Sequence, residues 1–270
     1  MSLLFNEFKN DLEHLRKLLV LTDNVKLFTS HSFVPDSSIA HDNFTVKGLE
    51  IQGLGRDANI GLTFVPGTLI LYLAGRFEYF VRSIFEDLAA GIADRCVKFE
   101  NLPKDFKENL FLFTADVMKN PRKFGHAENG RNSFINALSD NIKGLDIASV
   151  NIKCISITTE NMRPTILSEL FARIGAKEVW TKIGQHPKTQ IFFQTGDPNN
   201  ATNESKKKLE QFMDLRNTIA HPSVSFSWPD MATINSHIDF IESLSLALDE
   251  IAGIYLLSLV KAPVAGINQL

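Results

Sequence analysis

Residues 67–93, GTLILYLAGRFEYFVRSIFEDLAAGIA, carry the clearest helical pattern in the sequence. The large apolar side chains recur every three or four residues: Leu69, Ile70, Leu73, Phe77, Phe80, Val81, Ile84, Phe85 and Leu88. A stripe this broad is typical of a helix that packs against several others. The stretch therefore predicts the central helix of a helical core.

Shorter stretches with helical spacing lie on both sides of this helix. We expect further helices at about 3–22, 104–119, 128–143, 164–174, 177–184, 202–220 and from Ser227-Trp-Pro-Asp230 to about 261. Pro164 suits the first turn of its helix, and residues 227–230 resemble a capping box. Residues 150–157 and 188–194 alternate like short strands, and residues 44–51 suggest a small hairpin in a polar loop over 29–66. Together these patterns predict an all-α bundle with small strand or loop insertions.

The composition is that of an ordinary soluble globular protein, with 44% hydrophobic and 22% charged residues among 270. The formal net charge of -3 provides no overall basic field, so contact with nucleic acid requires a local patch. Cys96 and Cys154 lack metal or redox spacing, which favours a reducing setting. The longest apolar run near the C-terminus, residues 251–260, is too short to span a bilayer. We therefore expect a cytoplasmic protein with no membrane partner.

The stretch with the most distinctive chemistry is Asp214-Leu-Arg-Asn-Thr-Ile-Ala-His-Pro222, at the end of the predicted helix 202–220. The apolar stripe of that helix places Arg216 where the next core residue belongs. A guanidinium in a core is costly unless it is paired or faces an interface. Asn217 precedes His221 by four residues, so the two share a face if the helix extends that far.

Pro222 disfavours helical geometry at the preceding residue, so we expect His221 at or just beyond the last turn. The negative end of a helix favours a protonated imidazole, and histidine titrates near neutral pH. A proton-transfer group beside a fixed cation suits RNA cleavage by its own 2'-hydroxyl, which needs no metal in principle. A structural interpretation stays open beside it. His221 would then only cap the helix, and Arg216 would pair with an acidic residue of another helix.

The order Arg-Asn-x-x-Ala-His-Pro at the end of a late helix resembles the HEPN superfamily. The hallmark of that superfamily is an arginine followed a few residues later by a histidine, often with asparagine directly after the arginine. The early helix with Phe77-Glu78-Tyr79 looks like its first core helix. Residues 161–183, the motif helix and the closing helix are similar to its RiboL-PSP branch. The resemblance covers about residues 65–262, and the loop at 29–66 has no counterpart in it.

This resemblance implies a HEPN-like helical bundle that works as a metal-independent endoribonuclease, with two copies of the motif meeting at a homodimer interface. By position, Arg216 would bind and polarise the scissile phosphate, and His221 would act as acid or base. Asn217 would orient His221 or contact the phosphate. The products would carry 2',3'-cyclic phosphate and 5'-hydroxyl ends.

The resemblance also sets expectations about partners. No cofactor or metal is expected, and the expected partners are RNA, a second copy of the chain, and an antitoxin or another member of a phage-defence complex. Some members of the superfamily are inactive. A non-catalytic module that binds a nucleotide, RNA or a partner protein is therefore the alternative, and a purely structural helical scaffold is the third possibility.

Glu78 is a candidate supporting residue, because the resemblance suggests an acidic partner for Arg216 on the early helix. The competing interpretation is an ordinary surface ion ladder, because Glu78, Arg82 and Glu86 are spaced by four residues.

Three lysines, Lys206, Lys207 and Lys208, precede the motif on its helix and are weak candidates for contact with an RNA backbone. A solvated helix start is the plainer interpretation of this run. The other histidines are scattered without zinc spacing: His14, His31, His41, His126, His186 and His237. We therefore expect no metal site.

The expected domain organisation has three parts. Residues 1–66 would form an N-terminal helix and a polar loop or hairpin packed on the bundle. Residues 67–262 would form the HEPN-like helical domain, and residues 263–270 a C-terminal tail.

Overall fold

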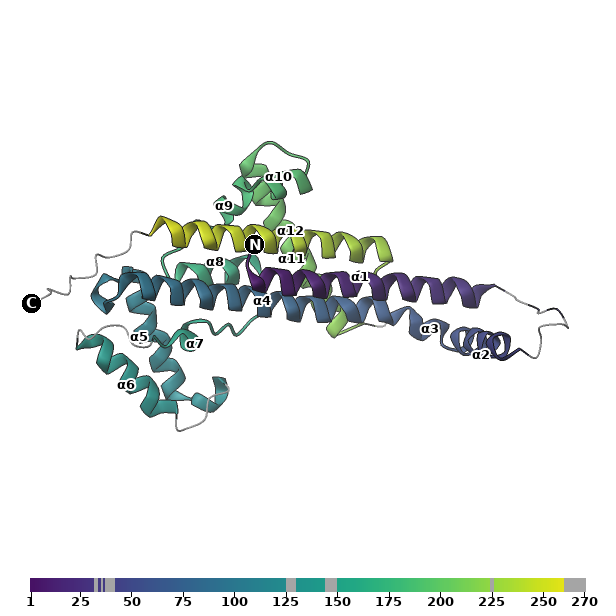
Figure 1. Ribbon diagram of the computed structural model, residues 1–270, viewed down its shortest axis with the longest axis horizontal. Coiled ribbons are helices and arrows are strands. Elements are labelled where there is room, and N and C mark those ends of the chain that lie inside the picture. Colours follow the sequence, from purple (N-terminus) through teal and green to yellow (C-terminus); the bar gives the residue numbers. More distant parts are fainter. Residues whose placement is uncertain are drawn as a thin grey trace, which may run out of the picture. The chain divides into compact units, whose positions relative to one another are not determined.

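The computed structural model describes residues 1–31, 34, 36, 42–124, 130–143, 150–223 and 226–259. Every regular element within these residues is helical (Figure 1). The α-helices are α1 (Leu3–Ser30), α2 (Asn43–Asp57), α3 (Asn59–Leu62), α4 (Phe64–Cys96), α5 (Lys104–Lys119), α6 (Gly130–Ile142), α7 (Ile152–Ile155), α8 (Pro164–Ala172), α9 (Val179–Gln185), α10 (Pro187–Phe192), α11 (Pro198–Ala220) and α12 (Met231–Ser258). Two 3-10 turns lie at Phe99–Asn101 and Pro121–Phe124. The all-α class is confirmed.

The central helix is α4, and its predicted stripe lies in the core. Eight of the nine stripe residues are buried, and Leu69 is partly exposed. The predicted bounds of α5 are confirmed, whereas α1 continues to Ser30 and α11 begins at Pro198, each beyond its predicted bounds. Pro164 begins α8 as expected. α12 begins at Met231, and Asp230 itself caps it by accepting the backbone N–H of Thr233 at 2.7 Å, so the capping box expected from Ser227 is wrong.

The predicted strand and hairpin insertions are wrong. Residues 44–51 belong to α2, where Asp42 caps the helix by accepting the backbone N–H groups of Phe44 and Thr45. Residues 150–157 contain the one-turn helix α7, and residues 188–194 overlap α10. His186 caps α10, and Pro187 occupies its first turn. Local capping thus favours the helical form in α2 and α10, whereas α7 has no side-chain cap and buries Cys154 and Ile155.

Some expectations fall outside the described residues. These are the tail at 263–270, residues 260 and 261 of the last expected helix, residues 32, 33, 35 and 37–41 of the expected loop, the first two residues of the helix expected at 128–143, and His41 and His126.

The described residues form two compact units that interleave along the chain. Unit 1 comprises Met1–Phe5, Glu78–Glu210 and the chain from Ser243 onward; unit 2 comprises Asn6–Phe77 and Gln211–Glu242. The boundary expected at residue 66 does not separate these units. The three-part domain organisation stays a prediction.

Unit 2 contains α2, α3 and parts of α1, α4, α11 and α12, and charged and aromatic contacts join several of these segments. Arg16 of α1 donates to Asp239 at 2.6 Å and to Glu242 at 2.8 Å, both on α12. The rings of Phe212 on α11 and His237 on α12 lie 5.4 Å apart. Trp228, in the segment before α12, packs on α4 where Gly67 leaves room for its ring. Each contact joins segments that are far apart in sequence, so the bundle holds the end of α11 in place.

Unit 1 is built around the second half of α4, with which the second half of α12 packs closely. A Cβ at Gly91 of α4 would lie within 2.8 Å of the Leu256 side chain of α12. The connected helices α5, α6 and α7 lie together in Figure 1, and Asn151, just before α7, donates to the Phe134 carbonyl of α6 at 3.1 Å. These contacts give unit 1 its own core.

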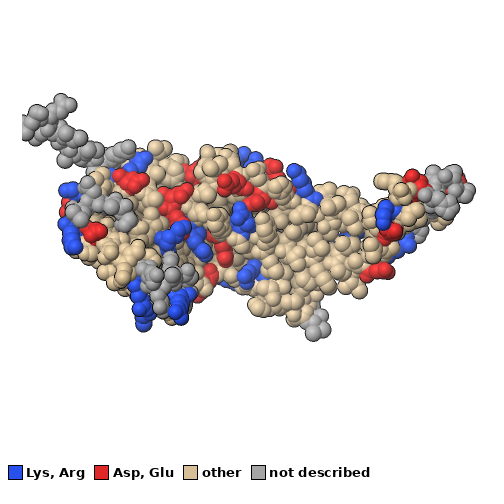
Figure 2. Space-filling model, turned by 60° about the horizontal axis from the view of Figure 1, so that its bottom comes forward, with Lys and Arg blue, Asp and Glu red and all other residues tan. Residues whose placement is uncertain are grey.

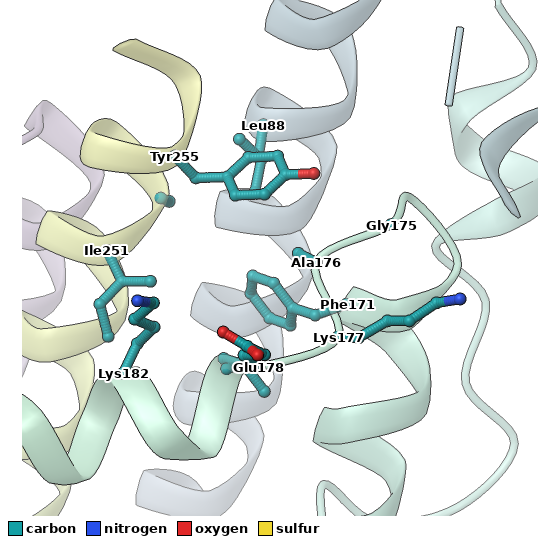
Figure 3. Close-up of a pocket in the computed structure, with 11 residues that line it drawn as sticks. Leu88, Phe171, Gly175, Ala176, Lys177, Glu178, Lys182, Ile251 and Tyr255 are labelled. Carbon is teal, nitrogen blue, oxygen red and sulfur yellow. The ribbon is translucent and has the colours of Figure 1, made fainter. Parts of the chain in front are cut away.

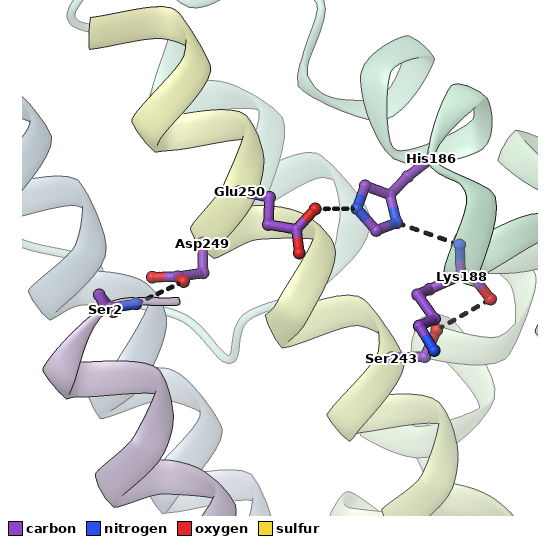
Figure 4. Close-up of polar contacts among 6 residues, drawn as sticks. All are labelled: Ser2, His186, Lys188, Ser243, Asp249 and Glu250. Carbon is purple, nitrogen blue, oxygen red and sulfur yellow. Dashed lines mark hydrogen bonds and ion pairs between the residues drawn. The ribbon is translucent and has the colours of Figure 1, made fainter. Parts of the chain in front are cut away.

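Polar contacts on α12 hold two other elements of unit 1 (Figure 4). Asp249 accepts the backbone N–H of Ser2 at 2.8 Å, which fastens the start of α1. Glu250 contacts Nε2 of His186 at 2.9 Å, while Nδ1 of the same ring lies 3.3 Å from the Lys188 backbone nitrogen. Because Nδ1 accepts the backbone N–H of Lys188, the ring proton is on Nε2, and Nε2 donates it to Glu250. The buried His186 ring therefore joins α10 to α12.

The segment Asn59–Cys96 is long and apolar enough to cross a membrane by length and composition, and 33% of its most apolar window is buried. Core helices of soluble proteins share this property. The expectations of a cytoplasmic protein and of no membrane partner stay predictions.

Candidate functional site

The Arg-Asn-His motif lies at the C-terminal end of α11, within unit 2. Phe212, Met213 and Ile219 are buried and fix the orientation of the last two turns. The helix ends at Ala220, directly before His221 and Pro222. The expected position of His221 just beyond the last turn is therefore confirmed, and it follows from the restriction that proline places on its predecessor.

Asn217 contacts both other members of the motif. Its side-chain oxygen accepts a hydrogen bond from Nη1 of Arg216 at 3.1 Å. Its backbone carbonyl accepts the backbone N–H of His221 at 3.1 Å. Arg216 and Asn217 are half-buried, whereas the His221 side chain is exposed. The motif thus combines a partly shielded cation, an amide and an accessible imidazole within the last turn and its exit.

The contacts of Arg216 explain how a guanidinium can lie on the apolar stripe of α11. A half-buried guanidinium keeps part of its hydration, and the hydrogen bond to Asn217 satisfies one of its five donors. The backbone bond of His221 continues the helical ladder by one residue, so its backbone is held while its side chain meets solvent. Such a group can exchange protons with a bound molecule.

Glu78 lies in unit 1, in a polar cleft of about 450 Å³. The cleft is lined by Glu78, Arg82, Thr158, Thr159, Glu160, Asn161 and Arg163. Oε1 of Glu78 accepts the backbone N–H of Met162 at 3.1 Å. Glu78 and Arg216 belong to different units, so their expected pairing stays a prediction.

The expected ion ladder on α4 is replaced by contacts with residues 153–162. Arg82 donates to Thr158 at 3.4 Å, and Glu86 accepts from Ser156 at 2.7 Å and pairs with Lys153. Glu78, Arg82 and Glu86, on three successive turns of α4, therefore all contact the segment 153–162. Nε of Arg82 is buried and has no hydrogen-bond partner among the described residues.

Residues that the sequence did not single out complete this cleft. Arg173 donates to the carbonyls of Ile155 and Ile157, each at 2.7 Å, and burial lowers the pKa of its guanidinium. These bonds hold the start of the cleft segment, while Arg163 pairs with Glu210 of α11. A possible sequence signal was the polar run Thr158-Thr-Glu-Asn161 directly before Pro164, but it identifies no partner.

The three lysines before the motif lie two turns inside α11, because the helix begins at Pro198. The ammonium of Lys206 lies 6.0 Å from the centre of the Trp180 ring. Burial lowers the pKa of the partly buried Lys208, while Lys207 is exposed. Lys206 and Lys207 are both exposed, which fits the plainer interpretation of a solvated face, whereas Lys208 is partly buried. The run lies inside α11 and not at its start. A contact of these lysines with RNA stays a prediction.

The drawn face in Figure 2 carries basic and acidic side chains close to one another. No group of three or more side chains suited to a metal ion comes together among the residues that the structure describes. The metal-free mechanism stays a prediction that only an assay can test.

One of three comparisons with known proteins found a match. A family model described as RiboL-PSP-HEPN matches residues 55–253, which extend from the end of α2 through most of α12 and include the motif. Neither the curated proteins nor the solved structures that were compared with the chain gave a match.

Proposed function

Because the chain belongs to the RiboL-PSP-HEPN family, we propose that it is a metal-independent endoribonuclease whose catalytic residues are Arg216 and His221. The observation that carries this proposal is the exposed His221 directly after α11, connected through Asn217 to the half-buried Arg216. The residues that the family model matches include this motif.

The proposed reaction is an internal transesterification of RNA. The 2'-hydroxyl loses its proton to a base and attacks the adjacent phosphorus, and the bond to the 5'-oxygen breaks as that oxygen gains a proton. His221 serves as the base or the acid. Arg216 binds the non-bridging oxygens and stabilises the charge that develops on them. The products carry 2',3'-cyclic phosphate and 5'-hydroxyl ends.

A single His221 supplies only one of the two proton transfers at a time. A second copy of the chain would bring a second His221 and a second Arg216 to the same phosphate, which divides the roles of base and acid. We therefore propose a homodimer with a composite site. We further propose that the protein acts in phage defence or as the toxin of a toxin–antitoxin pair.

The second candidate function is a non-catalytic HEPN module that binds a nucleotide, RNA or a partner protein. The hydrogen bond within the chain between Arg216 and Asn217 favours it, because an internally paired arginine has one donor fewer for a phosphate. This module would bind without turnover, and RNA cleavage would be absent from wild type and variants alike.

The test is RNA cleavage in excess EDTA by wild type, His221→Ala and Arg216→Ala, with end-group analysis of the products. We expect cyclic-phosphate ends from the wild type only, while both variants keep the wild-type circular dichroism spectrum. Gln211→Ala is the control, because it changes an exposed residue of α11 outside the motif. Cleavage by His221→Ala at the wild-type rate would show that the assignment of His221 is wrong.

A further inference from the structure

Unit 1 contains a largely apolar cavity that the proposed chemistry does not use. Its volume is about 210 Å³. The walls come from α4, α8, α9 and α12: Leu88, Phe171, Val179, Ile251, Ala252 and Tyr255. Figure 3 shows the rings of Phe171 and Tyr255 and the side chain of Ile251 around this space. An engineered apolar cavity of about 150 Å³ is large enough to bind benzene. The present cavity is large enough for a branched aliphatic or aromatic group.

Two oppositely charged side chains line the same cavity. Glu178 is the residue directly before α9, and Lys182 lies one turn into that helix. Both are exposed, so the cavity opens to solvent beside them. Neither has an ion pair or side-chain hydrogen bond within the described part of the chain. In Figure 3 the Lys182 side chain runs alongside Ile251, and the Glu178 carboxylate lies near Phe171.

The other polar groups of the cavity are already accounted for. Lys177 pairs with Asp105 at 2.8 Å, and Figure 3 shows it extending away from the cavity. Burial raises the pKa of Tyr255, so its hydroxyl stays neutral at physiological pH. Gly175, with φ +91°, lets the loop between α8 and α9 pass close to the Tyr255 hydroxyl. Glu178 and Lys182 are therefore the charged groups that remain for a ligand.

We propose that this cavity binds a free apolar α-amino acid. The side chain of the amino acid fills the apolar space, its carboxylate pairs with Lys182, and its ammonium pairs with Glu178. Glu178 directly precedes α9 and Lys182 lies one turn into it, and both line the cavity, as this clamp requires. An uncharged apolar molecule would leave both charges unused, and a simple carboxylate would meet the like charge of Glu178. This inference goes beyond the proposed ribonuclease and does not depend on it.

The test is isothermal titration calorimetry of the full chain with L-leucine and L-phenylalanine. We expect saturable binding of at least one of them at millimolar concentration or below. Lys182→Met and Glu178→Gln should each weaken binding by about tenfold or more, because each removes one charged contact. Lys188→Met is the matched control, an exposed lysine near α9 that does not line the cavity.

Two analogues of leucine test the clamp without altering the protein. Leucinamide lacks the carboxylate, and 4-methylpentanoate lacks the ammonium group, so both should bind about tenfold more weakly than leucine. Ala252→Met, which fills the cavity, should abolish binding. The proposal is overturned if neither amino acid binds the wild type, if both charge variants bind like the wild type, or if both analogues bind as tightly as leucine.

Discussion

At the scale of single residues, Asn217 contacts both the guanidinium of Arg216 and the backbone of His221. Its side-chain oxygen holds Arg216, and its backbone carbonyl holds the first residue beyond the helix. The two roles use different atoms of one residue. Substitution of its side chain should therefore affect Arg216 while leaving the backbone of His221 in place.

We predict that Asn217→Ala lowers RNA cleavage by roughly 10²-fold, because a freely rotating Arg216 is no longer held in its position. Asn217→Asp keeps an acceptor for Arg216 and should lose less activity than Asn217→Ala. The measurement is the single-turnover rate at saturating protein. Equal losses in the two variants would argue against an orienting role for the side-chain oxygen.

Cys154 gives a second prediction at this scale. It is buried beside Thr114, and burial raises the pKa of its thiol from 9.0 to about 11. A raised pKa in the folded state means that the folded protein holds this proton more tightly than the unfolded chain. The resulting stabilisation is complete below pH 9.0 and is lost as the pH rises through about 11.

We therefore predict that the urea midpoint falls between pH 9.0 and 11, and that this fall is smaller in Cys154→Ala. The comparison uses the slope with pH, because Cys154→Ala also changes packing. Native Cys154 should resist alkylation by iodoacetamide at neutral pH, where it is a buried thiol. Rapid alkylation of native Cys154 would contradict this prediction.

The sequence identified the motif because proline restricts its predecessor and because a charged residue on an apolar stripe is conspicuous. It did not identify the residues around Glu78, because Thr158 meets Arg82 of α4, and Arg163 meets Glu210 of α11, only through the fold. Nor could spacing predict that Arg82 and Glu86 bind a distant segment instead of each other. Local sequence rules were therefore enough to find the Arg-Asn-His motif, whereas the cleft around Glu78 depends on tertiary contacts.

At the scale of elements, two helical glycines have opposite roles. A Cβ on Gly184 of α9 would lie 2.0 Å from Oγ1 of Thr202 and 2.4 Å from the Pro198 carbonyl oxygen. A Cβ on Gly75 of α4 would meet nothing within 4 Å. Glycine is therefore required where α9 meets the start of α11, and it only weakens the helix at Gly75.

We predict that Gly184→Ala destabilises the protein by about 1–3 kcal/mol, because the backbone of α11 must move. Gly75→Ala should stabilise it by about 0.5–1 kcal/mol, the usual gain from replacing an exposed helical glycine. Urea unfolding of both variants beside the wild type measures the two changes. A stabilised Gly184→Ala would mean that α9 and α11 are less tightly packed than described.

The long helices could be predicted because their stripes extend over many turns. The short elements could not, since α2, α7 and α10 contain β-branched and aromatic residues that also suit strands. Their helical form depends on particular contacts, such as the cap of α10 by His186 and the burial of Cys154 and Ile155 in α7. Asp230 was predicted to lie at the start of a helix, because a capping residue is recognised from its neighbours in sequence.

At the scale of the whole molecule, the proposed composite site makes activity depend on pairing between chains. We predict that adding an equal amount of an Arg216→Ala, His221→Ala double variant to the wild type lowers total cleavage by about half. Random exchange would pair half of the active chains with an inactive partner. The measurement is the initial rate after exchange, with light scattering to establish the mass of the dimer.

Two results of that mixing experiment would contradict the proposal. Unchanged activity after exchange would mean that one chain holds a complete site. A monomeric protein that cleaves RNA would lead to the same conclusion. A variant carrying Gln211→Ala in place of the double substitution is the control, and its addition should raise total cleavage.

The sequence pattern predicted the helical class of the chain, but it did not predict the division of the chain into two compact units. The interleaved units follow from where long helices pass from one set of contacts to another, as α4 does after Phe77 and α11 does after Glu210. No change of composition marks either place. Organisation of this kind depends on contacts between residues far apart in sequence, which periodicity does not report.

The two tryptophans of the chain lie one in each unit. Trp180 of unit 1 is buried and donates its indole N–H to the Pro164 carbonyl at 2.9 Å. Trp228 of unit 2 contacts the ring of Phe64, 4.9 Å away between centroids. Each variant with a single tryptophan is thus a fluorescent sensor for one unit, and comparing their emission during denaturation would show whether the two units melt together or in sequence.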